Sequence, residues 1–325
     1  MDMKTFAAAL LVLGAAAAPS AHALDVPSAV VDAAWVNAHK GELTILQVSG
    51  PLKAFTTAPE IKTEKGKLMV LRVSGHVPGA HFVDFKTVRV DRTIAGKKVK
   101  GLIPPKQEFE KLVRSWGVNN NAALVIVPAG RNTGDVGAAT RLYWQLKYYG
   151  HNNMAILDGG MAAWLAAGLP AATDAPTHGA GDWTARGEDK SILATYQEVK
   201  SDLGRKGMQF VDARPQNQYM GVFTKPGELS GHLPGARDFS PDLVTTAGGN
   251  GARFLPAASY RSLMKAKHIN PAAATVTYCN TGHLASGVWF VAHEIVGNKR
   301  ARLYDGSMVE YSALGGKTVN PARLN

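Results

Sequence analysis

The sequence predicts an α/β fold built from two duplicated domains, each a mostly parallel sheet flanked by helices. Two pairs of segments indicate the duplication: GHVPGAHFVDF at 75–85 returns as GHLPGARDFSP at 231–241, and ILDGGMAAW at 156–164 returns as LYDGSMVEY at 303–311. In each half an apolar strand and then a helical pattern lie between these landmarks. Landmarks in the same order about 150 residues apart indicate a repeated domain, and strands that alternate with helices indicate an α/β sheet.

Residues 1–23 predict a secretory signal peptide. A lysine near the start is followed by an apolar run from 6 to 18 and by Ala21-His22-Ala23, a small-x-small cleavage pattern. The run is too short to span a bilayer, and no later stretch is long and apolar enough to do so. The alternative is an alanine-rich tail. We expect a mature chain that begins near Leu24 and is exported to the periplasm.

The repeat and the composition divide the chain. We expect an N-terminal domain over 24–172, a linker over 173–190 that contains Pro, Gly and Asp, and a C-terminal domain over 191–325. A chain of this length has material for two cores. Helix is expected to resume near 193–203.

Short apolar runs bounded by polar residues and glycine predict buried strands. They lie at 43–49, 123–127, 208–214 and 275–279. Apolar residues at helical spacing predict helices over 140–151 and 286–298, each ending near a glycine.

The net charge of +11 is spread thinly along the chain. An exported chain without a basic stripe is not expected to bind nucleic acid. A mild attraction for small anions or for an anionic membrane surface is the simpler interpretation.

Cys279 is the only cysteine. It is a buried small hydrophobe, an intermolecular bridge or a reactive thiol. It stands where a strand ends and the turn CNTGHL leads into a helix, a position at which open α/β sheets bind ligands. Unpaired N–H groups and the helix dipole there favour a thiolate and lower its pKa. We therefore expect a reactive thiol inside a ring of backbone amides from Asn280 through Ala285.

The chain resembles the tandem-domain sulfurtransferases of the rhodanese family, which include thiosulfate and 3-mercaptopyruvate sulfurtransferases. The resemblance rests on GHVPGA and LDGGMAAWLAAGLP in the first half, and on VDARPQNQYMG, GHLPGA, YCNTGHLAS and LYDGSMVEY in the second. It implies that Cys279 takes a sulfane sulfur from a small donor anion and forms a persulfide. A thiol, a cyanide-like acceptor or a partner protein then removes the sulfur, with no metal or organic cofactor. The N-terminal domain has no cysteine and would be scaffold and cleft wall.

The resemblance also implies the substrate-binding residues. They are Asn280, Thr281, Gly282, His283, Leu284, Ala285 and Arg214. For Arg214 an ion pair that supports the loop is preferred to direct substrate contact. His283 could pair with the cysteine, but a solvated position at the pocket rim is favoured.

Three positions depart from the family pattern. Asn280 and Thr281 stand where thiosulfate enzymes usually carry Arg and Lys, and Gln218 stands where the family often has an anchoring arginine. Lys225 in the following loop is a candidate for the missing charge.

Two other functions remain open. Some phosphatases share the fold and use Cys-x5-Arg, but the sixth residue after Cys279 is Ala285, which cannot clamp phosphate. A non-catalytic periplasmic sulfur carrier or persulfide-binding module is the stronger alternative. No His, Cys and Asp spacing suggests a zinc site.

Overall fold

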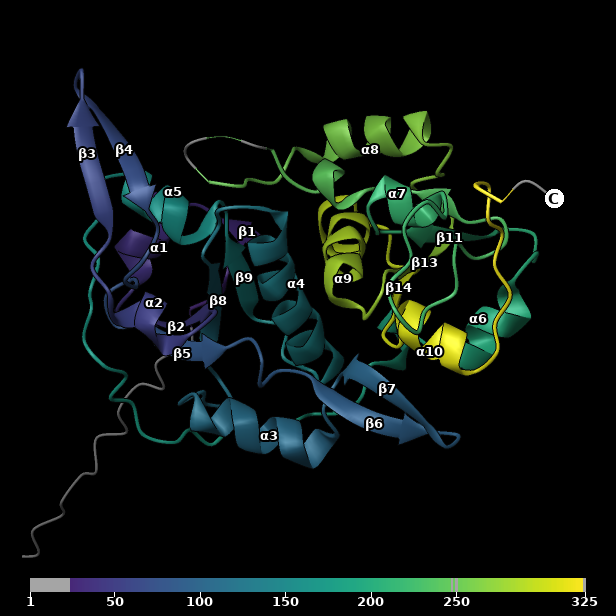
Figure 1. Ribbon diagram of the computed structural model, residues 1–325. Helices are drawn as coiled ribbons and strands as arrows, with labels where there is room; N and C mark the ends of the chain where they lie inside the picture. Colours follow the sequence, from purple (N-terminus) through teal and green to yellow (C-terminus); the bar gives the residue numbers. More distant parts are fainter. Residues whose placement is uncertain (1–23, 247, 249–250, 324–325) are drawn as a thin grey trace, which may run out of the picture.

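The computed structural model describes residues 24–246, 248 and 251–323, so the expected signal peptide at 1–23 lies outside the described residues (Figure 1). Each domain contains one parallel five-stranded sheet. The N-terminal order is β1-β9-β8-β2-β5, with β1 Val30–Val31, β2 Leu43–Ser49, β5 His81–Asp84, β8 Ala123–Pro128 and β9 Met154–Leu157. The C-terminal order is β10-β14-β13-β11-β12, with β10 Leu193–Ala194, β11 Met208–Asp212, β12 Arg237–Asp238, β13 Ala274–Tyr278 and β14 Ala301–Tyr304. The two orders match strand for strand, which confirms the predicted fold.

Helices pack on both faces of the N-terminal sheet, because alternate residues along a strand point to opposite faces. Val125 and Val127 of β8 share an apolar cluster with Trp164, whereas Leu124 and Ile126 belong to a second cluster. The helices of this domain are α1 Ala33–His39, α2 Leu52–Thr56, α3 Lys106–Ser115, α4 Thr133–Tyr148 and α5 Gly160–Ala166. Those of the C-terminal domain are α6 Tyr196–Asp202, α7 Gln216–Tyr219, α8 Ala257–Ala266, α9 His283–Phe290 and α10 Ser307–Ala313, with a π-helix Val291–Ile295 after α9.

Two helices begin earlier than the sequence predicts. Helix α4 starts at Thr133 because the Asn132 side chain accepts a hydrogen bond from Asp135 N at 3.0 Å, a normal N-cap. Helix α9 starts at His283, directly after Gly282. The predicted turn CNTGHL is therefore wrong at its last two residues, His283 and Leu284, which are already helical.

The two domains share an apolar core. Helices α4 and α9 lie side by side at the centre of the molecule (Figure 1), and Tyr143 of α4 meets Phe290 of α9 edge to face at 4.9 Å. A hairpin of the N-terminal domain, β6 Val90–Ile94 and β7 Lys97–Leu102, reaches α10 of the other domain. A second hairpin, β3 Glu60–Glu64 and β4 Lys67–Arg72, lies at the opposite end of the molecule (Figure 1).

A buried ion pair joins the domains beside this core. Arg141 of α4 lies 2.5 Å from Asp305, and their side chains are 0% and 6% exposed. The other oxygen of Asp305 accepts a hydrogen bond from Ile103 N at 2.9 Å. Both charges have lost their water, so each depends on the other.

The segment over 173–190 contains no helix or strand before Lys190. Trp183 in this segment is buried, and its backbone N–H donates to Val118 O at 3.1 Å. The connection between the domains is thus fastened to the N-terminal domain. None of the helices in the described part of the chain has the length and apolar character needed to cross a membrane.

We expect Arg141→Met to lower the free energy of unfolding by about 3–5 kcal/mol, because Asp305 would remain buried without its partner. Arg72→Met is the matched control, since its ion pair with Glu60 is exposed on both sides and should contribute at most about 1 kcal/mol. Urea denaturation followed by circular dichroism measures both. Equal urea midpoints for the two variants would contradict the role given to the buried pair.

Candidate functional site

Cys279 follows β13 and is 2% exposed. Its N–H donates to Ser307 Oγ at 3.1 Å, and its carbonyl accepts from Met308 N at 3.0 Å. Ser307 Oγ in turn donates to Tyr304 O at 2.8 Å. The start of α10 therefore holds the cysteine backbone in place. Burial alone would also fit an inert apolar cysteine, and the residue belongs to the large apolar cluster that includes Ala213 and Ala285.

Gly282 is the one residue of this turn that must be glycine. Its φ is +69°, and a Cβ at this position would lie 2.6 Å from Arg141 Nη1 and 2.7 Å from Asp305 O. Its N–H donates to Ser307 Oγ at 3.1 Å. The expected ring of backbone amides around the sulfur therefore does not include Gly282, because the Gly282 N–H is hydrogen-bonded to Ser307 Oγ.

Asn280 is buried and turns toward its own domain. In the amide orientation that satisfies both side-chain atoms, it donates to Glu228 at 2.7 Å and to Gln218 at 2.9 Å, and it accepts from Lys225 Nζ at 3.0 Å. Two of the three positions that depart from the family pattern, 218 and 280, are thus in contact with each other. Lys225 lies beside them, but its positive charge also interacts with the carboxylate of Glu228.

Arg214 is a structural residue. Its Nε donates to Asp212 Oδ1 at 2.9 Å, and its Nη2 donates to Asp212 Oδ2 at 2.6 Å and to Gly231 O at 2.7 Å. The side chain is only 2% exposed. The preferred interpretation as an ion pair agrees with these contacts, and direct substrate binding by Arg214 does not.

The expectation that His283 is a solvated side chain at the rim is wrong. Its ring packs against Phe85 of the N-terminal domain at 4.6 Å, and its Nε2 lies 3.0 Å from where a Cβ on Gly137 would be. Burial is the largest of the causes that lower the pKa of His283 to about 3, and nearby Arg89 and Arg141 contribute to the same shift. His283 is therefore a neutral packing residue between the domains at physiological pH.

The remaining predicted residues also face the interface. Thr281 Oγ1 lies 3.4 Å from Arg89 Nη1. Leu284 is half-buried and packs against the shared core, and Ala285 is fully buried in the first turn of α9. The consecutive residues 279–285 thus form one segment, which contacts Arg89, Arg141 and Phe85 of the N-terminal domain.

Sequence reasoning missed two arginines of the N-terminal domain. Arg89 is near enough to Cys279 that the thiolate raises its pKa, although burial and Arg141 outweigh this and lower it. Arg141 also donates to Gly282 O at 3.4 Å. Neither residue belongs to a motif, and only the folded interface shows them. The repeat could have flagged Asp305 and Ser307, because YDGS follows a strand in the second half as LDGG does in the first.

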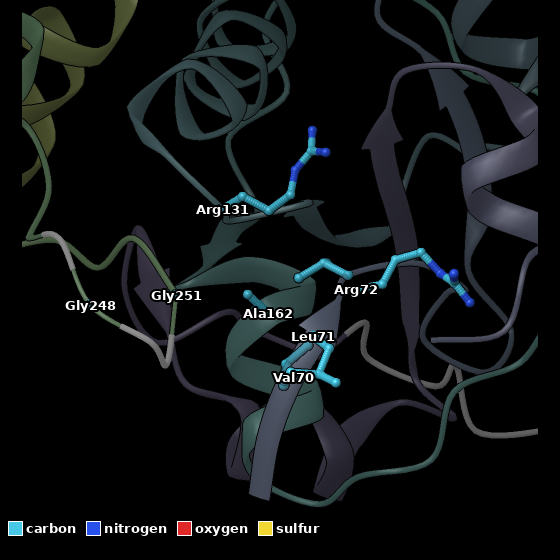
Figure 2. Close-up of a pocket in the computed structure, with 8 residues that line it drawn as sticks. Val70, Leu71, Arg72, Arg131, Ala162, Gly248 and Gly251 are labelled. Atoms are coloured by element: carbon cyan, nitrogen blue, oxygen red, sulfur yellow. The ribbon is translucent and has the colours of Figure 1, made fainter. Parts of the chain in front are cut away.

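The matching position of the N-terminal domain holds Arg131, since RNTG at 131–134 corresponds to CNTG at 279–282. Its guanidinium is paired with Asp135 at 2.8 and 3.0 Å. Arg131 lines a cavity of about 350 Å³ together with 70–73, Ala162, Gly248 and Gly251. In Figure 2 the guanidinium of Arg131 points away from that of Arg72. This domain therefore has no nucleophile at its equivalent turn.

The model of the rhodanese-like domain matches residues 39–167 and 195–314. The chain belongs to the rhodanese family. Among the described residues of this rhodanese-family chain, no group of three or more His, Cys, Asp and Glu side chains could hold a metal ion.

Relatives cover almost the whole rhodanese-family chain. A protein of Haloferax volcanii named "Putative thiosulfate sulfurtransferase" is 29% identical over 296 residues, which are 89% of this chain and 95% of the relative. The "Sulfur carrier protein TtuD" of Thermus thermophilus is 26% identical over 306 residues, 90% of this chain and 96% of the relative. The structure of SseA from Escherichia coli, a 3-mercaptopyruvate sulfotransferase, superposes with a TM-score of 0.69 at 21% identity, covering 86% of this chain and 98% of that one.

We expect the stability of the protein to fall below about pH 6.5 because of His283. Its folded pKa of about 3 lies under the ordinary 6.5, so the unfolded chain binds a proton first and stability is lost as the pH falls from 6.5 toward 3. Between pH 8 and pH 5 the loss from this group is about 2 kcal/mol. Urea unfolding at pH 8 and pH 5 should show that His283→Gln removes this contribution to the pH dependence of the free energy of unfolding.

The exposed His268 provides the control, and His268→Gln should keep the wild-type dependence on pH. If His283→Gln loses as much stability at pH 5 as the wild type does, the neutral interface role is incorrect.

Proposed function

We propose that the protein is a sulfurtransferase that carries sulfur on Cys279. The thiolate attacks the outer sulfur of a donor such as thiosulfate, the new S–S bond forms as the donor S–S bond breaks, and sulfite leaves with the electron pair. A donor of the mercaptopyruvate type would instead release pyruvate, with the thiol proton ending on carbon. Covalent catalysis of this kind divides one difficult transfer into two.

The second half-reaction returns the enzyme to its first state. A thiolate or cyanide attacks the outer persulfide sulfur, and the S–S bond breaks with its electron pair on the Cys279 sulfur. The acceptor departs as a persulfide or as thiocyanate, and the Cys279 thiolate is regenerated. Small thiols, cyanide and the cysteine of a partner protein are all acceptors of this class.

The position of Cys279 carries the proposal. The only cysteine of the chain stands between the end of β13 and the start of α9, inside the second rhodanese-like domain. Arg89 is near enough to Cys279 for the thiolate to act on its charge, and Arg141 donates to Gly282 O in the same turn. Positive charge favours a thiolate over a thiol and supports a persulfide equally. The names of the relatives agree with sulfur transfer.

A sulfur carrier is the second candidate, because one relative is named as such and because Cys279 is deeply buried. A carrier would form the same persulfide but would release it only to a partner protein.

Incubation with thiosulfate, and separately with mercaptopyruvate, should add about 32 Da to the intact mass, one sulfur atom on the thiol. Cyanide should remove it. Cys279→Ser should abolish the adduct, whereas Arg131→Ser, at the matching position of the other domain, should leave it unchanged.

An adduct that forms but does not turn over with cyanide or small thiols would favour the carrier. Failure of every sulfur donor to label the wild-type protein would eliminate both candidates.

We also propose that the chain is exported and works in the periplasm after removal of 1–23. The support is the sequence pattern of an apolar run followed by Ala21-His22-Ala23. In a bacterial host with a periplasm, the periplasmic extract should contain a protein whose N-terminal residue is Leu24. Val12→Arg, which interrupts the apolar run, should leave the full-length chain in the cytoplasm, while Ser28→Arg should not. Unprocessed wild-type chain in the cytoplasm would contradict export.

A further inference from the structure

Arg89 comes from the N-terminal domain, between β5 and β6, and reaches the cysteine turn of the other domain. Its Nη1 lies 3.4 Å from Thr281 Oγ1, a residue 192 positions away in the sequence. Its guanidinium stacks over the Phe85 ring, with 4.6 Å between Cζ and the ring centre. On its other side the guanidinium lies against Gly101 of β7, where a Cβ would be 3.5 Å from Nη1, an ordinary van der Waals contact. The side chain is therefore held in one place.

Among the residues that the structure describes, no carboxylate forms an ion pair with Arg89. The two nearest acids are paired with other cations: Asp91 with Lys98 at 3.2 Å and Asp305 with Arg141 at 2.5 Å. Within 24–246, 248 and 251–323, the Nε of Arg89 is buried and has no hydrogen-bond acceptor. The side chain as a whole is half-buried, but a buried donor without an acceptor is unfavourable. An anion at this position would accept a hydrogen bond from that donor and pair with the charge.

The turn that carries Cys279 supplies no cation of its own, since 280–285 are Asn, Thr, Gly, His, Leu and Ala. His283 is neutral because burial lowers its pKa. Lys225 contacts Asn280, and its positive charge interacts with the carboxylate of Glu228. Arg214 forms an ion pair with Asp212. Arg89 is thus the guanidinium beside the thiol that remains available to a ligand.

We propose that Arg89 binds the anionic group of the sulfur donor, so that the specificity of the C-terminal site is set by a residue of the N-terminal domain. The inference rests on the proposed function and deepens it. A planar guanidinium donates two parallel hydrogen bonds to a sulfonate or carboxylate. With the anionic group on Arg89, the sulfane sulfur of the donor faces Cys279, and the charge that accumulates on the leaving sulfite is met by the same side chain.

The test compares two alkylating probes of nearly equal shape. Iodoacetate carries a negative charge and iodoacetamide does not, and both displace iodide to alkylate Cys279. The ratio of their rates reports the local cation and cancels changes in the reactivity of the thiol. Arg89→Met should lower the iodoacetate-to-iodoacetamide ratio on the order of tenfold, the effect of one charge-assisted hydrogen bond. The same variant should raise the KM for thiosulfate in persulfide formation.

Lys86→Met is the matched control, because it removes one exposed positive charge three residues away and should change the ratio less than twofold. Arg89→Lys keeps a charge without the planar fork and should retain most of the alkylation ratio. Arg89→Gln removes the charge but keeps a polar side chain, and it gives the same test if the methionine variant does not fold.

The two probes separate this inference from the proposed function. If wild-type protein forms no persulfide but Arg89→Met still lowers the alkylation ratio, anion binding by Arg89 is supported and sulfur transfer is not. If the ratio is the same in wild type, Arg89→Met and Arg89→Lys, the assignment of Arg89 is overturned, whatever the outcome with sulfur donors.

Discussion

The ion pair between Arg141 and Asp305 determines how the two domains meet. Arg141 belongs to α4, and besides Asp305 it donates to Gly282 O in the cysteine turn and to Gly101 O in the β6–β7 hairpin. One buried guanidinium therefore connects an N-terminal helix, an N-terminal hairpin and the C-terminal turn. Because a charge without water requires well-placed acceptors, these elements can adopt few other relative positions, and the surroundings of Cys279 follow from that arrangement.

The same interface sets the electrostatics of the site. Burial keeps His283 neutral and leaves Arg89 with an unused donor. The acidic groups nearest Arg89 are already paired, Asp305 with Arg141 and Asp91 with Lys98. The N-terminal domain lacks a cysteine, but its Arg89 and Arg141 both reach the turn that carries Cys279.

Duplication explains how the two halves came to differ in chemistry while sharing one topology. Both sheets have the same strand order, and both turns read NTG before a helix. In the first turn Arg131 pairs with Asp135, four residues along the chain, and its charge is neutralised locally. In the second turn Cys279 and His283 occupy those two positions. With no local partner for either residue, the second turn depends on the other domain for its counter-charges.

The amino-acid sequence predicted the duplication and the central strands, but neither of the hairpins β3–β4 and β6–β7. Apolar runs gave the strands β2, β8, β11 and β13 because a buried parallel strand must be apolar on both faces, and the repeated motifs gave the duplication and the place of Cys279. It did not give the start of α4 or α9, since capping by Asn132 and Gly282 outweighs the apolar periodicity at those ends.

Only the tertiary structure decided what surrounds the thiol. Arg89 and Thr281 are 192 residues apart, and no spacing in the sequence records which side chains of one domain will face the other. His283 shows the same limit: a polar residue in a turn predicts exposure, but contacts with Phe85 and Gly137 of the other domain leave it half-buried. Contacts between domains depend on the shape of both complete surfaces, so they appear only when both have folded.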